Sequence, residues 1–295
     1  MGVASALAAA LFVGAGTIGS WQFVRRKRSA RAGAVSKFVL YISIVQAVLS
    51  IASLAIVFEP LGPLALFVWV YAQTAFHLYM ALLARPALRH FSITCSVNMV
   101  AMWFFASLVL STPLLIATAV LPLPSTLLGC LIAGCYVLAA IGVVQSLRAS
   151  ETDVCISLPS RAPASSGEGT LVLRRGQPCH GPAGQGLRVI QLTDTHLGSF
   201  MSVDRLRRIC ERVVERAPDL VLLTGDFLTV ESQCCDSYLH EALSPLARLP
   251  PNTAFACYGN HDHESPGVVR RALNAHNITL LVDQEVMGWE SGRAT

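Results

Sequence analysis

The sequence predicts an α-helical membrane bundle followed by a soluble α/β domain. Three observations support this fold class: five long apolar runs in the first half, a change of composition near Arg148, and alternating strand and helix patterns after it. Before Arg148 the only acidic residue is Glu59, whereas acids, bases, glycines and prolines are mixed after it. A chain of 295 residues has room for about two domains, and the two halves differ too much to form one.

The first half, residues 1–147, is predicted to be a membrane domain. Five apolar stretches of roughly 20 residues or more are long enough to cross a bilayer core. None contains Lys, Arg, Asp or Glu, and they span residues 3–24, 38–58, 62–83, 96–120 and 125–147. His77 and Gln73 in the third stretch could mark a proton or substrate path, but a hydrogen bond between packed helices is the simpler interpretation. The expected partner of this half is therefore the lipid bilayer.

The basic residues predict the orientation of the chain in the membrane. They follow the first, third and fifth stretches, at Arg25, Arg26, Lys27, Arg28, Arg31, Lys37, Arg85, Arg89 and Arg148. Because loops rich in Lys and Arg stay cytoplasmic, we expect a multi-pass protein with the N-terminus outside and the soluble domain in the cytosol. A cleaved signal peptide is disfavoured, since the first run is too long and no positive charge precedes it.

Cysteine content and net charge exclude some other classes of protein. Nine cysteines form no readable disulfide or zinc-knuckle framework, which favours a reducing compartment. The net charge of +4 is an average over two halves of different composition. The excess basic residues flank the apolar segments, where they can interact with lipid headgroups. No nucleic-acid binding is evident.

Residues 148–186 are rich in Pro, Gly and Ser and are interpreted as a linker with two strand-like runs, one of them an expected edge strand. Residues 187–295 then alternate between buried strands and amphipathic helices. Strands are predicted over 187–192, 219–223 and 253–257, and residues 278–282 are strand-like. One helix is predicted after a Ser202 cap, and a second helix is predicted over 236–249. This order implies parallel strands joined by right-handed crossovers.

Polar clusters follow each of the three main strands. They begin at Asp194 (DTH), at Gly225 (GDF) and at Gly259 (GNHD). Ligands bind beyond the carboxyl ends of such strands, so these clusters should meet at one edge of the sheet. Each cluster alone is weak evidence, but three in order favour a metal site over separate turn and surface residues.

These residue types suit a centre with two divalent metal ions. Asp194 and His196 offer an oxygen and an imidazole nitrogen to one ion, and Asp226 has two oxygens with which to bridge both. Asn260 would bind the second ion, while His261 would act as the catalytic residue that protonates the leaving oxygen or stabilises its developing charge. Two ions roughly 3.5–4 Å apart are the arrangement used for in-line attack on a phosphoryl group.

The series DTH, GDF and GNHD resembles the calcineurin-like metallophosphoesterase superfamily over about residues 188–286. The resemblance implies an αββα sandwich, of which this chain would hold part, with manganese, iron or zinc as plausible ions. It also implies that Asp194 and His196 hold the first ion, Asp226 bridges, Asn260 binds the second ion and His261 acts on the substrate. Thr229 stands where the protein-phosphatase branch has an acidic residue, which argues against close kinship with that branch.

The resemblance also implies a later single His and a later Gly-His-x-His segment that complete both metal shells. Nothing after Asp262 supplies them, so we expect a truncated form. The predicted function is membrane-anchored, metal-dependent hydrolysis of an unknown phosphoester by a metal-activated water, inactive or weak in this form. The alternatives are a non-catalytic membrane scaffold or dominant-negative fragment, and a transporter with an accessory soluble half.

Overall fold

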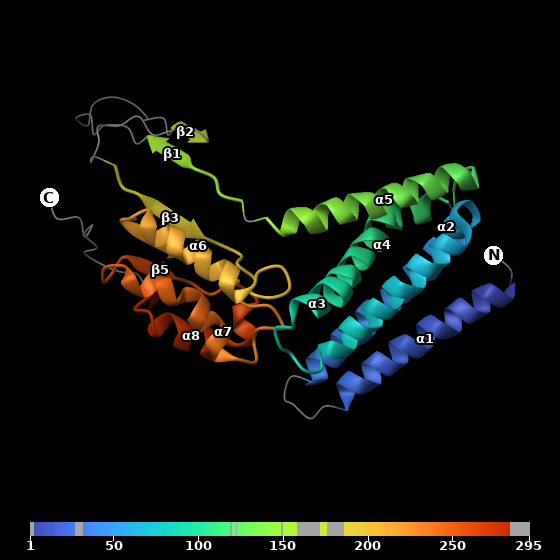
Figure 1. Cartoon of the computed structure of the whole chain (residues 1–295), viewed down its shortest axis with the longest axis horizontal. Helices are drawn as coiled ribbons and strands as arrows, with labels where there is room; N and C mark the ends of the chain where they lie inside the picture. Colours follow the sequence, from blue (N-terminus) through green and yellow to red (C-terminus); the bar gives the residue numbers. More distant parts are fainter. Residues whose placement is uncertain are drawn as a thin grey trace.

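A computed structural model describes residues 3–26, 32–118, 120–121, 123–148, 150–157, 172–175 and 186–283. Figure 1 shows a bundle of long helices, with the α/β region at one end of the bundle and the N-terminus at the other. The two predicted halves are therefore a mostly helical region and an α/β region with a parallel sheet.

The bundle is built from the apolar helices. They are α1 (Val3–Arg25), α2 (Ala32–Leu82), α3 (Phe91–Ile93), the π-helical η1 (Thr94–Asn98), α4 (Met99–Ala117) and α5 (Ser125–Ser146). Among the described residues, five stretches are long and apolar enough to cross a membrane: Ser5–Arg25, Val35–Ile56, Gly62–Leu82, Phe91–Ala117 and Ser125–Ser146. The second and third stretches belong to one long helix that is broken at Gly62, where φ is 55°. The break therefore lies where the predicted stretch 62–83 begins.

Polar side chains join the helices inside the bundle. The Gln73 side-chain oxygen accepts hydrogen bonds from Gln46 (2.8 Å) and Ser50 (2.7 Å), and its nitrogen lies 2.7 Å from His77 Nε2. Gly16 of α1 allows the His77 ring to approach, because a Cβ there would lie 2.3 Å from His77 Cδ2. These contacts support the interpretation of Gln73 and His77 as helix-packing residues.

Over residues 186–283 the structure describes a four-stranded parallel sheet and three α-helices. The sheet order is β3 (Val189–Leu192), β4 (Leu220–Leu223), β5 (Ala254–Ala256), β6 (Thr279–Leu280). The connecting helices are α6 (Val203–Glu215), α7 (Asp236–Leu243) and α8 (Pro266–Asn274), with 3-10 turns η2 (Ser244–Arg248) and η3 (Asp262–Glu264). Because each helix joins neighbouring strands in the same direction of the sheet, right-handed crossovers place all three helices on one face.

Local sequence explains these elements. The Ser202 hydroxyl accepts a hydrogen bond from Arg205 N and caps α6, whose buried face carries Leu206, Cys210 and Val213. The α7 helix ends at Leu243 and continues as the 3-10 turn η2, which has Pro245 in its first turn, so the α-helix is shorter than the predicted 236–249.

Two further strands, β1 (Val154–Ser157) and β2 (Val172–Arg175), lie in the predicted linker. They pair antiparallel with each other, so neither extends the main sheet as an edge strand. Cys155 on β1 is disulfide-bonded, a bond the sequence analysis did not predict. Since disulfides are typical of oxidising compartments, this bond argues against the expected reducing compartment.

Candidate metal centre

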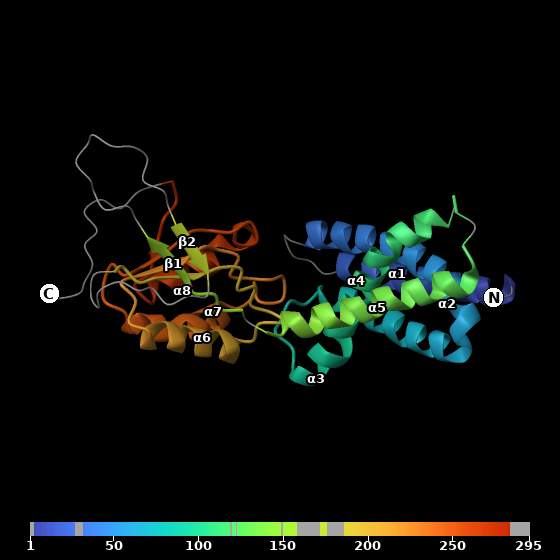
Figure 2. The ribbon, with the colours of Figure 1, turned by 90° about the horizontal axis from the view of Figure 1, so that it is seen from above.

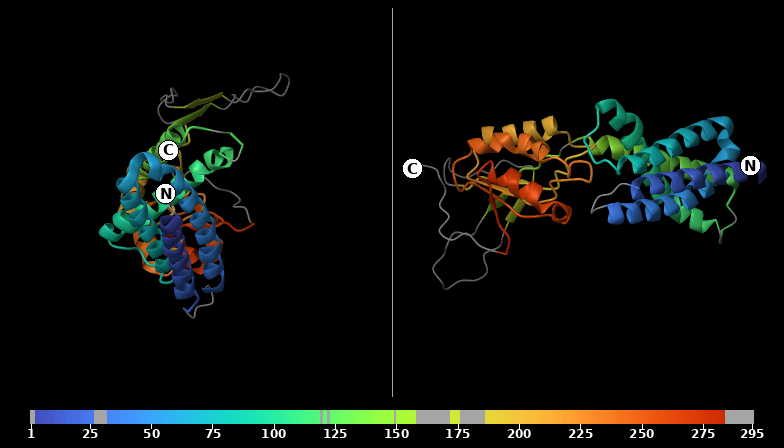
Figure 3. Two further views of the ribbon diagram at one scale, coloured as in Figure 1. Left: turned by 90° about the vertical axis from the view of Figure 1, so that its right-hand side faces the viewer. Right: turned by 90° about the horizontal axis from the view of Figure 1, so that it is seen from below.

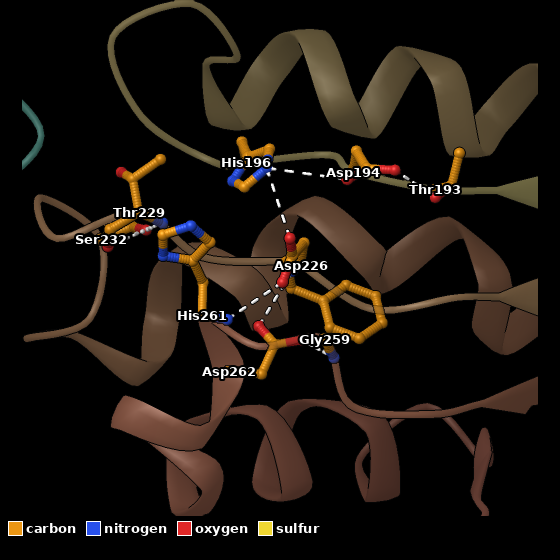
Figure 4. Close-up of polar contacts among 10 residues, drawn as sticks. Thr193, Asp194, His196, Asp226, Thr229, Ser232, Gly259, His261 and Asp262 are labelled. Carbon is orange, nitrogen blue, oxygen red and sulfur yellow. Dashed lines mark hydrogen bonds and ion pairs between the residues drawn. The ribbon is translucent and has the colours of Figure 1, made fainter.

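The loops that follow β3, β4 and β5 meet at the carboxyl edge of the sheet (Figure 4). The first two loops are joined by backbone hydrogen bonds, from His196 N to Asp226 O (2.9 Å) and from Leu197 N to Phe227 O (2.8 Å). The third loop reaches the second through His261 N, which donates to Asp226 Oδ1 at 3.0 Å. The parallel sheet therefore brings together the three clusters that the sequence separates by some 30 residues each.

Three side chains form a group that could hold a metal ion. Ligand atoms of His196, Asp226 and His261 all lie within 4.8 Å of one another. His196 Nε2 is 3.6 Å from Asp226 Oδ2, and the His196 and His261 rings meet edge to face at a centroid distance of 5.2 Å. Two imidazoles and a carboxylate are a donor set that suits Mn, Fe or Zn.

The other two predicted ligands lie at the rim of this group. Asp194 Oδ1 is 3.8 Å from His196 Nε2, and its carboxylate also accepts a hydrogen bond from the Thr193 hydroxyl. Asn260 is exposed and adjoins His261 in the chain. Asp194 therefore approaches the group directly, whereas Asn260 is placed near it by its position in the loop.

Three residues at this edge of the sheet have strained backbone conformations. Asp194, His196 and Asp226 have φ values of 50°, 40° and 54°, in the left-handed region that non-glycine residues rarely adopt. Such conformations cost on the order of 1–3 kcal/mol each and cluster at functional sites. The strain here falls on predicted metal ligands, which indicates that the fold holds these side chains in place.

Asp262 is a structural member of the site to which the sequence analysis gave no role. Its buried carboxylate accepts hydrogen bonds from Phe227 N and Gly259 N, both at 2.9 Å, and so ties the second loop to the third. Burial raises the pKa of the Asp262 carboxyl above its usual range, although the donated hydrogen bonds oppose that shift. The sequence signal that could have identified Asp262 as part of the site is its position in the GNHD cluster.

The remaining histidines of the α/β region have other contacts. His276 is buried, and its Nε2 lies 2.7 Å from the His240 carbonyl oxygen. The exposed His263 ring lies 5.4 Å from the Tyr258 ring. Neither His276 nor His263 belongs to the three-residue group.

Fold, loop order and donor set together define a class of protein. Residues 187–294 match the family model of the calcineurin-like phosphoesterases. This family match and the similarity to curated relatives support the calcineurin-like metallophosphoesterase superfamily for this region, and by family a phosphoester hydrolase.

Three curated relatives illustrate the similarity. Phosphodiesterase YaeI of Escherichia coli is 32% identical over 101 residues, which cover 33% of this chain and 37% of the relative. A transmembrane protein with metallophosphoesterase domain from Danio rerio is 37% identical over 84 residues, covering 28% and 18%. UDP-2,3-diacylglucosamine pyrophosphatase LpxG of Chlamydia muridarum is 35% identical over 78 residues, covering 26% and 23%. The chain thus matches about a third or less of these relatives' lengths, and no solved structure matches it.

Proposed function

We propose that the protein is a membrane-anchored phosphoester hydrolase with a two-metal centre. The convergence of His196, Asp226 and His261 within 4.8 Å, at the carboxyl edge of a parallel sheet, is the observation that carries this proposal. The printed names of the relatives, a phosphodiesterase and a pyrophosphatase, agree with chemistry at a phosphoryl group.

In this proposal each side chain has a separate role. Asp194 and His196 would hold the first ion, Asn260 would hold the second, and Asp226 would contribute to both. Divalent ions bound there would supply positive charge for the phosphoryl transition state and would activate water. His261, whose backbone is fixed by Asp226 Oδ1, presents its imidazole to the leaving oxygen as a proton donor.

We expect the 295-residue chain itself to hydrolyse phosphoesters weakly or not at all. The four proposed ligands, Asp194, His196, Asp226 and Asn260, leave both ions short of protein ligands, and loosely held ions lack the fixed spacing that two-metal catalysis needs. The assay uses purified protein in detergent with excess manganese or zinc, an activated phosphodiester, and Asp226→Asn as the control. Turnover well above the control would overturn this expectation and indicate that another residue, such as His263, completes the shell. Turnover equal to the control, together with no metal binding, would favour a non-catalytic scaffold.

We further propose a cytosolic location for the α/β domain, because Arg25, Arg26, Arg85, Arg89 and Arg148 all follow helix ends on one side of the bundle. Protease added outside intact cells should leave an epitope fused after Thr295 intact. Digestion of the epitope would contradict the proposed topology and place the domain outside. An outside location would agree with the disulfide bond at Cys155.

A further inference from the structure

The carboxyl edge of the sheet, which carries the proposed metal ligands, faces the end of the helical bundle. Figures 1 and 2 both show the loops between the sheet and the bundle turned toward the ends of the long helices, and the same arrangement is seen from below in Figure 3. Hydrogen bonds between described residues cross from one region to the other: Tyr79 donates to Glu231 Oε1 (3.2 Å), and Asn98 donates to Ser199 Oγ (2.8 Å). Tyr79 lies in the last turn of the third candidate span, and Asn98 ends the π-helical segment near the start of the fourth.

Glu231 is the centre of this contact. Its side chain is buried, with 8% of the residue exposed, and it accepts from Tyr79, from Ser199 (3.3 Å) and from Thr229 (2.6 Å). A buried carboxylate is costly unless it is hydrogen-bonded, so these three donors make the contact specific. We call Tyr79, Asn98, Ser199, Thr229 and Glu231 the docking network.

The docking network uses the same two loops that carry the proposed metal ligands. Ser199 lies three residues after His196, and Glu231 lies five residues after Asp226. The Thr229 hydroxyl is also 2.8 Å from Leu197 O, which joins the two loops to each other. Apolar packing adds to the contact, since Val230 packs against the core of the bundle and Leu88 against the core of the α/β region.

Basic side chains surround this end of the bundle. Arg25, Arg26, Arg85 and Arg148 are exposed at helix ends, and Arg89 is partly exposed. Arginines beside the ends of membrane spans lie at the depth of lipid headgroups and attract their phosphates. The docked metal edge is therefore held beside a layer rich in phosphoesters.

From this placement we propose that the substrate of the metal centre is a phosphoester carried by a membrane lipid at the bilayer surface. The proposal rests on the proposed hydrolase function. Water oxygen forms the new bond to phosphorus, the ester P–O bond breaks, and a proton passes to the leaving alcohol oxygen, which leaves a phosphate and an alcohol. A substrate confined to the same bilayer meets the docked site at a high effective concentration without further contacts.

The test compares a lipid phosphate with a soluble one. The chain is reconstituted in phosphatidylcholine nanodiscs with saturating Co²⁺, and the visible absorption of the bound cobalt is followed. Phosphatidic acid within the bilayer should change the spectrum at a total concentration roughly 100-fold lower than inorganic phosphate in solution. A response to inorganic phosphate alone would overturn the lipid proposal and leave the hydrolase proposal standing, whereas a response to neither would overturn both.

Variants on the bundle side separate docking from metal binding. Tyr79→Phe combined with Asn98→Ala removes both hydrogen bonds between the regions and leaves the loop residues in place. We expect this pair to lower the preference for lipid over soluble phosphate by about tenfold or more. Tyr71→Phe is the matched control, because the Tyr71 hydroxyl donates within the bundle to Ser96 O. An unchanged preference in the double variant would overturn the role of docking.

Discussion

Replacing Asp226 by asparagine should weaken divalent metal binding more than any other single change among the proposed ligands. Asp226 Oδ2 faces His196 Nε2 at 3.6 Å, and Asp226 Oδ1 accepts from His261 N at 3.0 Å, so the carboxylate stands between two of the loops. An asparagine oxygen can keep the bond to His261 N, but the negative charge and one metal-binding oxygen are lost. Substitutions that only support a ligand cost roughly 10–100-fold in metal affinity, so we expect at least about 100-fold here.

The comparison variant is Asn260→Ala, which removes an exposed amide assigned to one ion only. Bound manganese or zinc is measured by titration calorimetry and by metal analysis after dialysis. Circular dichroism checks that both variants remain folded. Equal metal affinity in the two variants would argue against a bridging role for Asp226.

The sequence was sufficient to predict the features of the fold that depend on local pattern. The membrane spans follow from length and hydropathy, and the three polar clusters follow from strands that end at Leu192, Leu223 and Ala256. The α8 helix was missed, although Val268, Val269, Ala272 and Leu273 are buried on one face of it. It has only nine residues, and its second is Gly267, so its helical pattern is short and weak.

Long-range contacts could not be predicted in the same way. Tyr79 and Glu231 are 152 residues apart, and Asn98 and Ser199 are 101 apart, so no local periodicity relates them. A glutamate in a loop is ordinarily solvent-exposed, and only the folded arrangement reveals that Glu231 is buried among three donors. The left-handed conformations of Asp194 and Asp226 are likewise set by the packing of the loops around them.

The close approach of the second and third metal loops depends on two glycines. Gly225 has a φ of 83°, and a Cβ at this position would lie 2.1 Å from Gly259 N. A Cβ on Gly259 would in turn lie 2.1 Å from Asp226 Oδ1. Neither contact can be relieved by a flexible side chain alone, because backbone atoms of the neighbouring loop are also within 3 Å. The position of Asp226 therefore depends on both residues remaining glycine.

Gly225→Ala should accordingly destabilise the α/β region by about 2–5 kcal/mol. A left-handed residue with a side chain costs roughly 1–2 kcal/mol, and overpacking adds about 1–3 kcal/mol. For a region of this size, at roughly 4 °C per kcal/mol, the melting temperature should fall by roughly 8–20 °C, as followed by circular dichroism in detergent. Metal affinity should fall as well, because separation of the loops displaces Asp226 from His261 N.

Gly186→Ala is the matched control, since a Cβ at Gly186 would meet no atom within 4 Å. It introduces the same methyl group shortly before β3 and should leave both the melting temperature and the metal affinity unchanged. If Gly225→Ala melted at the same temperature as Gly186→Ala, the two loops could separate at little cost. The close packing of Gly225 against Gly259 would then not be what holds Asp226 in the metal centre.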